Sequence, residues 1–390
     1  MNPWTCRVLG GTALLLAAGL GTARAQTTYP SIKISGRLQE QFYAFDNDPF
    51  AAAVGPTSNV FTRRARIEAK GQIAENVSFF IQPSFEGGRN LSGVSTTCTS
   101  TPVPAGGGTP TITCKTTGRS GFRLRDAWID VRFGPAKSKS SLYLRAGQEK
   151  RPFGRYELTS STNLPSIERG AGNGLPGKAS NNLFEEAGFL SHDVGASLRL
   201  EHQLDDARLA TLKVGVYNGQ GESLNDGNDA KSVGVRGTVG VYRKLDLGGS
   251  VFSRDKIQGA DSSFRNTGWG FDASWGKLGD AGLYLVGDYM QGKDGSPGKL
   301  RIRGLSLVGA YNIRMKSPTA WLYAIEPAIR YDFADPDTDA PDNRVTTLTA
   351  VLGLYLSSKA QLRLAYERQS FQLSTLESVT GIRSALTVNF

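Results

Sequence analysis

The feature of this sequence that most constrains its fold is an alternation of polar and apolar residues within segments of about ten residues. The last segment, 381–390, shows the pattern clearly. Its apolar face is formed by Ile382, Leu386, Val388 and Phe390. Such a period of two residues predicts a β-strand whose two faces meet different surroundings. Because the polar faces of several segments carry full charges, we expect water on one side of the sheet and an apolar environment on the other.

Sixteen segments of this kind recur along the chain, and few helix signals lie between them. Their predicted bounds are 31–45, 61–73, 76–88, 121–134, 141–150, 189–203, 208–218, 231–243, 245–255, 266–277, 281–292, 299–315, 319–333, 344–358, 360–373 and 381–390. Aromatic residues cluster near the ends of these segments, which predicts the interfacial girdles of a membrane barrel. Examples are Tyr43, Trp275, Tyr284 and Tyr331.

The connections between the segments alternate in length. Short links such as "RKLD" and "SSKA" follow the even-numbered segments, and longer links such as 89–120 and 151–188 follow the odd-numbered ones. This order is typical of an up-and-down barrel with short periplasmic turns and long extracellular loops. A soluble sandwich or propeller has no reason to sort its connections in this way. The even number of strands would place both termini on the periplasmic side.

Hydropathy excludes a helical membrane protein but not a membrane barrel. The mean hydropathy is −0.28, and after residue 25 no apolar run approaches the roughly 20 residues of a membrane helix. The strands of a barrel each carry only a weak hydropathy signal. In hydrocarbon every backbone N–H and C=O group must be paired, so the sheet has to close. We therefore predict an all-β fold: one transmembrane antiparallel β-barrel of about sixteen strands within residues 26–390.

Residues 1–25 predict a cleaved secretory signal peptide. A positive charge at Arg7 precedes a short apolar core, 13–20, and a small-x-small cleavage site that ends at Ala25. The alternative is a buried N-terminal helix. Cleavage would remove Arg7 and Arg24, which lowers the formal net charge from +10 to +8. A basic surplus indicates nucleic acid, an anionic membrane or anionic solutes, and export argues against nucleic acid.

Two cysteines remain after this cleavage, Cys98 and Cys114. An even number of cysteines in an exported chain predicts a disulfide, which here would staple a loop rich in glycine, proline and threonine. A free reactive pair or a metal site is less favoured, because no histidine or further cysteine lies nearby. We expect no cofactor. The acidic loops 46–50, 224–229 and 335–343 favour Asx turns over calcium sites.

Several stretches resemble the phosphate-selective porin O/P family of Gram-negative outer membranes. They include "FTRRARIEAKGQIAENVSFFIQPSFE", "RLRDAWIDVRF" and "LYLRAGQEKRPFGRYELTSSTNLPSIERG", and the resemblance extends from about Phe61 to Asp339. It implies a sixteen-stranded barrel in the bacterial outer membrane, usually a homotrimer, that conducts small solutes with a preference for anions such as phosphate. Outer-membrane lipid and lipopolysaccharide would then surround the barrel.

Basic residues on the inward faces are the candidates for the pore lining. Placing the apolar faces outward predicts a lumen lined by Arg64, Arg66, Lys70, Arg145, Arg236, Arg330 and Arg363. Arginine suits phosphate-like anions because its planar guanidinium stays charged and donates two hydrogen bonds at once. Inward acids interrupt this path, among them Asp130, Glu149, Asp272, Glu326 and Glu367. A broad anion pore or a general diffusion pore is therefore favoured at least as much as a phosphate-specific one.

The third long connection, 151–188, is expected to fold into the bore, as the third loop does in general porins. Its basic residues include Arg151, Arg155 and Arg169. Our hypothesis is that Arg151 and Arg155 face Arg64 and Arg66 and form a narrow zone that attracts anions. The alternative is that these charges only hydrate a wide pore and pair with nearby acids, Glu68 and Glu157.

The terminal aromatic residue, Phe390, has a predicted role of its own. If the last strand closes the barrel against the first, Phe390 faces lipid at the periplasmic rim and does not fray, unlike most chain ends in water. A terminal aromatic after an alternating strand also resembles the insertion signal that the barrel assembly machinery recognises.

Two other classes of function remain open from the sequence. A barrel adhesin or receptor would act through the long loops and have a plugged lumen. A barrel hydrolase would use His192 in "SHD", but adjacent residues of a strand point to opposite faces, so His192 and Asp193 do not obviously converge. A satisfied strand histidine is favoured over a catalytic one, and we predict a channel rather than an enzyme.

Overall fold

The computed structural model describes most of the region predicted to form the barrel. The described residues are 29–46, 58–86, 95–100, 112–117, 121–135, 137–170, 179–222, 229–257, 263–295, 300–319 and 321–390. The predicted signal peptide, 1–25, lies outside them. No helix in these ranges is long and apolar enough to cross a membrane.

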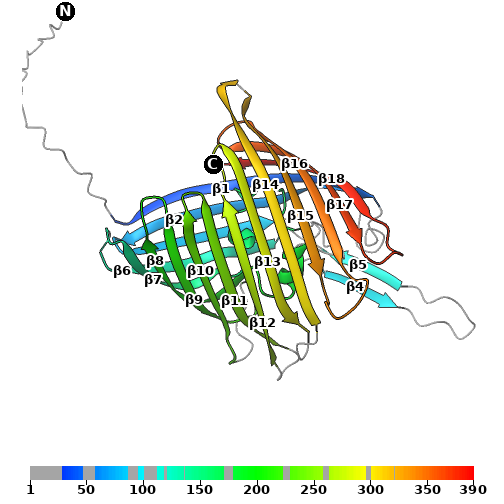
Figure 1. The fold of residues 1–390 in the computed structure, drawn as a ribbon, viewed down its shortest axis with the longest axis horizontal. Helices are drawn as coiled ribbons and strands as arrows, with labels where there is room; N and C mark the ends of the chain where they lie inside the picture. The colour runs from blue at the N-terminus through cyan, green and yellow to red at the C-terminus, as the bar shows by residue number, and fades with distance from the viewer. Residues whose placement is uncertain are drawn as a thin grey trace, which may run out of the picture.

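Sixteen antiparallel strands close into one barrel in the described part of the chain, as the alternation predicted (Figure 1). Each strand pairs with its sequence neighbour in the barrel, and the last pairs with the first. The strands are β1 (Ser31–Asp46), β2 (Ser58–Ala74), β3 (Val77–Glu86), β6 (Gly121–Phe133), β7 (Ser140–Lys150), β8 (His192–Gln203), β9 (Leu209–Tyr217), β10 (Ser232–Tyr242), β11 (Leu245–Ile257), β12 (Ser263–Trp275), β13 (Gly282–Asp294), β14 (Leu300–Thr319), β15 (Leu322–Asp335), β16 (Val345–Tyr355), β17 (Ala360–Phe371) and β18 (Val379–Asn389).

The connections alternate between short and long over most of the barrel, but the link from β12 to β13 (276–281) is slightly longer than the links on either side of it. The link from β10 to β11 runs only from Tyr242 to Leu245, whereas the connection from β7 to β8 holds two short helices. The connection from β3 to β6 holds a separate hairpin of β4 (Ser95–Ser100) and β5 (Ile112–Thr117). Its backbone register places Cys98 opposite Cys114, and the disulfide between them remains a prediction. Which end of the barrel faces the periplasm also remains a prediction.

The two faces of the wall invert the usual arrangement of a water-soluble protein. On β10, Val233, Val235 and Val239 are 37–39% exposed, whereas Arg236 between them is 6% exposed and points inward. Arg330 and Arg383 are among the most deeply buried side chains of the molecule. An apolar exterior and a polar interior satisfy a sheet that meets lipid outside and water inside.

The predicted aromatic girdle is only partly correct. Trp275 and Tyr331 are exposed on the outer face, but Tyr43 and Tyr284 are buried inside the barrel. Tyr43 packs there against the ring of Phe61, with ring centroids 5.9 Å apart. The prediction failed because nearness to a strand end does not fix the face on which a side chain lies, which depends on the parity of its position.

The seam between β1 and β18 includes the terminal residue. The Gly36 N–H donates to the Phe390 carbonyl over 2.9 Å, and the Phe390 N–H donates to the Gly36 carbonyl over 3.0 Å. The Phe390 ring is 62% exposed on the outer face, and a Cβ at Gly36 would lie only 2.4 Å from it. Phe390 is therefore held in the sheet, while its recognition by the assembly machinery remains a prediction.

The described residues of the connection from β7 to β8, 151–170 and 179–191, lie inside the barrel, and we call them the inner segment. It contains α2 (Arg155–Leu158) and α3 (Ser180–Glu186), both visible within the barrel (Figure 1). The residues that pack it against the wall are apolar and fully buried. They comprise Phe153, Phe184 and Phe189 of the segment and Phe252, Met290 and Ile302 of the wall. This contact fixes the position of the inner segment across the bore.

Candidate functional site

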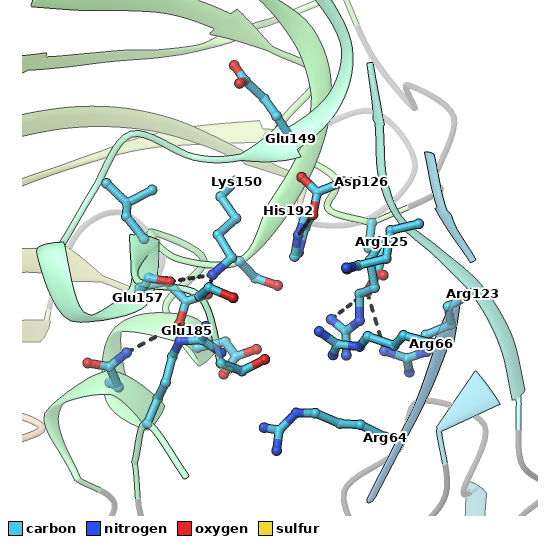
Figure 2. Close-up of a pocket in the computed structure, with 18 of the residues that line it drawn as sticks. Arg64, Arg66, Arg123, Arg125, Asp126, Glu149, Lys150, Glu157, Glu185 and His192 are labelled. Atoms are coloured by element: carbon cyan, nitrogen blue, oxygen red, sulfur yellow. Dashed lines mark hydrogen bonds and ion pairs between the residues drawn. The ribbon is translucent and has the colours of Figure 1, made fainter. Parts of the chain in front are cut away.

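A cavity of about 860 Å³ lies between the inner segment and the part of the wall formed by β2, β3 and β6–β9. Among its described lining residues, eleven are basic and eight are acidic, so the cavity carries a surplus of positive charge. The basic residues are Arg37, Arg63, Arg64, Arg66, Arg123, Arg125, Arg145, Lys150, Arg169, Lys213 and Arg383. Figure 2 shows the arginines of β2 and β6 facing Glu157 and Glu185 of the inner segment.

Two neighbouring arginines of β2 enter the cavity because this strand contains a β-bulge. Gln39 pairs with Arg64 and Glu40 pairs with Thr62, so Arg63 is an extra residue in the ladder. The bulge turns both Arg63 and Arg64 inward. Arg63 Nε lies 2.7 Å from Glu168 Oε1, and Arg64 Nη2 lies 3.1 Å from Glu168 Oε2.

Arg63 was missed because strict alternation would place it on the lipid face. The sequence nevertheless contains a signal for its true position. A lipid-facing arginine near the middle of a barrel strand costs about 2–4 kcal/mol, so two adjacent arginines in such a strand indicate a bulge that turns both inward.

A second group of arginines lies beside the first, on β6. Arg66 on β2 pairs with Ser84 on β3, and Ser84 pairs with Arg123 on β6, so the two arginines lie at the same level. Arg123 Nη1 and Arg125 Nη1 lie 3.4 Å and 3.2 Å from Glu222 Oε2. Our predicted pore lining did not include Arg123, Arg125 or Glu222. The R-L-R alternation could have revealed the two arginines, but nothing in the sequence ties the distant Glu222 to them.

Arg145 lies further along the same wall, on β7. Its Nε and Nη2 donate to the two carboxylate oxygens of Asp130 over 2.7 Å and 2.6 Å, and its Nη1 donates to Glu149 over 3.2 Å. Its guanidinium carbon also lies 3.5 Å from the centroid of the Trp128 ring. Arg145 thus lines the cavity as a fixed and strongly paired charge.

The inner segment contributes carboxylates to the opposite side of the cavity. Glu157 lies 3.5 Å from Lys150 Nζ and 3.4 Å from Arg169 Nε. Burial alone would raise the pKa of Glu157, but the charges of Arg169 and Lys150 outweigh it and lower this pKa. Glu185 projects into the cavity. Desolvation by the surrounding protein raises its pKa, and the negative charge of Glu157 raises it further. Glu185 is therefore the acid of this pair that more readily takes up a proton.

The hypothesis that Arg151 and Arg155 face Arg64 and Arg66 is wrong. Arg151 turns back to Asp193, with Nη2 and Oδ2 2.8 Å apart, and donates to backbone carbonyls of its own segment. Arg155 Nε lies 2.6 Å from Asp272 Oδ1 on β12, on the far side of the bore. Both arginines anchor the inner segment to the wall, because its path brings each beside a buried carboxylate.

The other predicted pore-lining residues lie in three places. Arg64, Arg66, Arg145 and Arg169 line the cavity. Lys70 is exposed beyond the lining, nearer the short connections. The other three are buried inside the barrel away from this cavity, on β10, β15 and β17. They are Arg236, Arg330 and Arg363. No described contact measures their effect on selectivity, so their role in anion passage remains a prediction.

The surroundings of His192 do not form a catalytic triad. Its Nε2 lies 3.3 Å from Asp126 Oδ2, and its Nδ1 has no hydrogen-bond partner among the described residues. Asp193 points instead to Arg151. A triad needs one ring nitrogen on a carboxylate and the other on a hydroxyl. In the part of the chain that the structure describes, no cluster of histidine, cysteine or acidic residues could hold a metal ion.

A closed barrel with an apolar exterior, a charged interior and an infolded third connection defines a channel of the outer-membrane porin class. The sequence profile of the phosphate-selective porin O and P family matches residues 32–266. The chain belongs to this family, as the sequence predicted, and is a Gram-negative outer-membrane porin for passive diffusion. No curated protein sequence matches it significantly.

Solved porin structures share this fold at low sequence identity. The anion-selective porin from Comamonas acidovorans aligns with a TM-score of 0.58 and 13% identity, over 93% of this chain and 100% of that one. OmpF of Salmonella typhi, in complex with daunomycin, gives 0.58 and 11% over 92% and 97% of the two chains. The outer membrane channel DcaP of Acinetobacter baumannii gives 0.55 and 12% over 93% and 97%.

Proposed function

We propose that this porin passes small hydrophilic anions, phosphate among them, along the basic wall formed by β2, β6 and β7. The observation that carries the proposal is the clustering of arginines on that wall, facing an open cavity with more basic than acidic residues. The fold shared with an anion-selective porin supports the same preference. The wall would attract an anion at several successive positions, which allows the anion both to enter and to leave.

The paired carboxylates favour a broad anion preference over phosphate specificity. Glu168, Glu222, Asp130 and Glu149 all contact arginines of the basic wall. A solute that binds there competes with these internal acids, so its net gain from each arginine is reduced. We therefore expect phosphate and chloride to pass with similar ease.

The zero-current potential of the purified protein in a planar bilayer tests this proposal. Under a KCl gradient we expect the potential to have the sign that a chloride-selective pore produces. Replacing part of the chloride by phosphate should change the conductance gradually, without strong block at low phosphate. A potential of the opposite sign would show a cation-preferring pore and would reject the proposal.

We propose that the protein acts without an enzymatic step. The environment of His192 supports this, because its two ring nitrogens are not engaged as a triad requires. Membership of a porin family argues equally against an adhesin with a plugged lumen. Assay of the purified protein with esterase and lipase substrates provides the test. Activity that disappears in the His192→Ala variant would show that the protein is an enzyme.

We also propose a homotrimer, inserted among outer-membrane lipid and lipopolysaccharide by the barrel assembly machinery. A solved relative of the same fold, OmpT of Vibrio cholerae, is described in a trimer form. Mass determination in detergent by light scattering tests the oligomeric state, and a monomer mass would reject it. Removal of Phe390 should reduce the amount of folded protein in the outer membrane, since this residue closes the β1–β18 seam.

A further inference from the structure

Two pairs of arginines on the basic wall each hold a glutamate that comes from a connection rather than from a strand. Glu168 of the inner segment contacts Arg63 and Arg64. Arg63 donates from Nε to Oε1 over 2.7 Å and from Nη2 to Oε2 over 3.1 Å. Glu222, in the connection after β9, contacts Arg123 and Arg125 over 3.4 Å and 3.2 Å. At both places a glutamate from a connection thus contacts two arginines of the wall, although Glu222 does so through Oε2 alone.

The two pairs lie close together on the wall. They are on β2 and β6, which are separated only by β3, so the distance between them across the sheet is about 10 Å. Between them, at the level of Arg66 and Arg123, lies a small residue, Ser84. The two glutamates therefore bring their negative charges to neighbouring positions on one surface of the cavity.

Each glutamate sits where a solute anion would bind. A carboxylate held between two guanidinium groups makes charge-assisted hydrogen bonds of the kind that phosphate or a solute carboxylate would make. Glu168 does so through both oxygens, and Glu222 does so through Oε2 alone. Burial alone would raise the pKa of Glu168, but Arg63 and Arg64 outweigh it and hold this pKa well below the usual range. Glu168 thus keeps its negative charge to a lower pH than an ordinary glutamate does.

We propose that Glu168 and Glu222 are built-in counter-ions that set the selectivity of the pore. They occupy two oxyanion positions on the basic wall. Passing anions are therefore attracted by the surplus positive charge of the wall but do not bind tightly. The class of ligand that these positions would hold is a small oxyanion, with inorganic phosphate as the probe. This inference rests on the proposed function, because it explains how a wall rich in arginine can favour anions without retaining them.

The experiment measures phosphate block of the chloride current in planar bilayers. The variants are Glu168→Gln, Glu222→Gln and the double variant, each in the full-length protein. Glutamine keeps the size and one oxygen acceptor of glutamate but removes its charge. Glu75→Gln is the matched control, since Glu75 also lies beside an arginine, Arg132, over 4.0 Å, but is exposed in the link after β2 and outside the cavity lining.

In the double variant we expect the phosphate concentration that halves the chloride current to fall about tenfold or more, as for one gained hydrogen bond to a charged group. The chloride-to-potassium permeability ratio should rise as well, and Glu75→Gln should match the wild type in both measurements. A conducting double variant with the same half-blocking concentration as the wild type would overturn the proposal.

The single variant Glu222→Gln keeps the test decisive if loss of Glu168 prevents folding. Glu222 makes its described contacts only with wall arginines and is not part of the apolar packing of the inner segment. We expect an intermediate fall in the half-blocking concentration, and an unchanged value would reject its role. A cation-selective wild type would instead contradict the proposed function, so the two failures are distinguishable.

Discussion

The two halves of the lumen wall are both rich in charge, yet they have different tasks. On β2, β6 and β7, arginines face an open cavity. On β12, β13 and β15, charged residues hold the inner segment: Asp272 contacts Arg155 over 2.6 Å, Asp288 accepts from the Tyr156 N–H over 3.0 Å, and Arg330 contacts Ser166 over 3.3 Å. The number of charges on a wall therefore does not identify the path of the solute. What separates the two halves is whether the charges line the cavity, as Arg64 does, or lie outside its lining, as Asp272 and Arg330 do.

Apolar residues sharpen the same contrast. The half that holds the inner segment has inward-facing Met290 and Ile302, which pack with Phe153, Phe184 and Phe189. On β12 and β13, Gly268 and Gly292 leave a slot for the Phe189 ring, because a Cβ at either position would lie within 3.1 Å of it. On this half of the wall, the inward apolar residues thus mark where the inner segment docks, whereas Phe80 and Trp128 on the other half line the cavity.

The largest expected effect comes from emptying this slot. Phe189→Ala should cost about 3–5 kcal/mol of packing, because it leaves a cavity between the inner segment and the wall. The inner segment should loosen, which we expect to appear as a larger and noisier single-channel conductance. Phe271→Ala, on the lipid face of the same β12, should leave the conductance unchanged. A Phe189→Ala channel with wild-type conductance would show that the packing does not hold the segment.

A smaller effect is expected from the polar anchor of the same half. Asp272→Asn removes the charge that Arg155 and Arg236 share, and each hydrogen bond to a charged group contributes about 1.5–3 kcal/mol. We expect the barrel to unfold at a lower temperature, as followed by semi-native electrophoresis. We also expect a modest rise in conductance. Asp246→Asn is the control, since Asp246 is half exposed and lies 3.9 Å from Arg155. Equal behaviour of the two variants would argue against the anchor.

On the cavity half we expect selectivity to change and conductance to change little. Arg64→Ala combined with Arg66→Ala should lower the chloride-to-potassium permeability ratio a few-fold, because both guanidinium groups line the cavity. Lys70→Ala should have no such effect, since Lys70 lies on the same strand but outside the cavity lining. Zero-current potentials in a KCl gradient measure both, and an unchanged ratio in the double variant would exclude Arg64 and Arg66 from the selective zone.

The smallest expected effect is a pH dependence from the inner segment. Because the pKa of Glu185 is raised, its carboxylate takes up a proton at a higher pH than an ordinary glutamate does as the pH falls. Its negative charge is then lost while Glu157, whose pKa is lowered, keeps its own. We expect the anion preference to rise within about twofold between about pH 7 and about pH 5. Glu185→Gln should remove this rise, and a rise that persists in this variant would assign it to another group.

The sequence predicted the barrel well because its signal is local and repeated. Each strand shows its own alternation, and one residue of error in a boundary does not change which residues face inward. The inward positions of Arg64, Arg66 and Arg145 followed from that parity. The sixteen-stranded closure and the family were confirmed for the same reason: the pattern repeats along the whole chain, so a local error has little effect.

The candidate site was predicted less well because it depends on irregular backbone. The path of the inner segment has no period, so nothing in the sequence showed that Arg151 and Arg155 would serve as anchors. The contact of Glu222 with Arg123 joins residues far apart in sequence. The inward position of Arg63 was missed because a bulge breaks the alternation on which the prediction depended. Inward apolar residues such as Met290 do not by themselves locate the docking half of the wall, because Phe80 and Trp128 also face inward at the cavity.

The bulge on β2 has an evolutionary consequence. Arg63 is surplus to the ladder, so deleting this single codon would leave Gln39 opposite Arg64 and Glu40 opposite Thr62. Every other side chain of the strand would keep its face, whereas a deletion elsewhere in a barrel strand would exchange lipid-facing and water-facing residues. One positive charge at the pore wall can therefore be gained or lost by insertion or deletion of a single codon. The ion selectivity of the pore can thus change in the course of evolution without altering the rest of the strand.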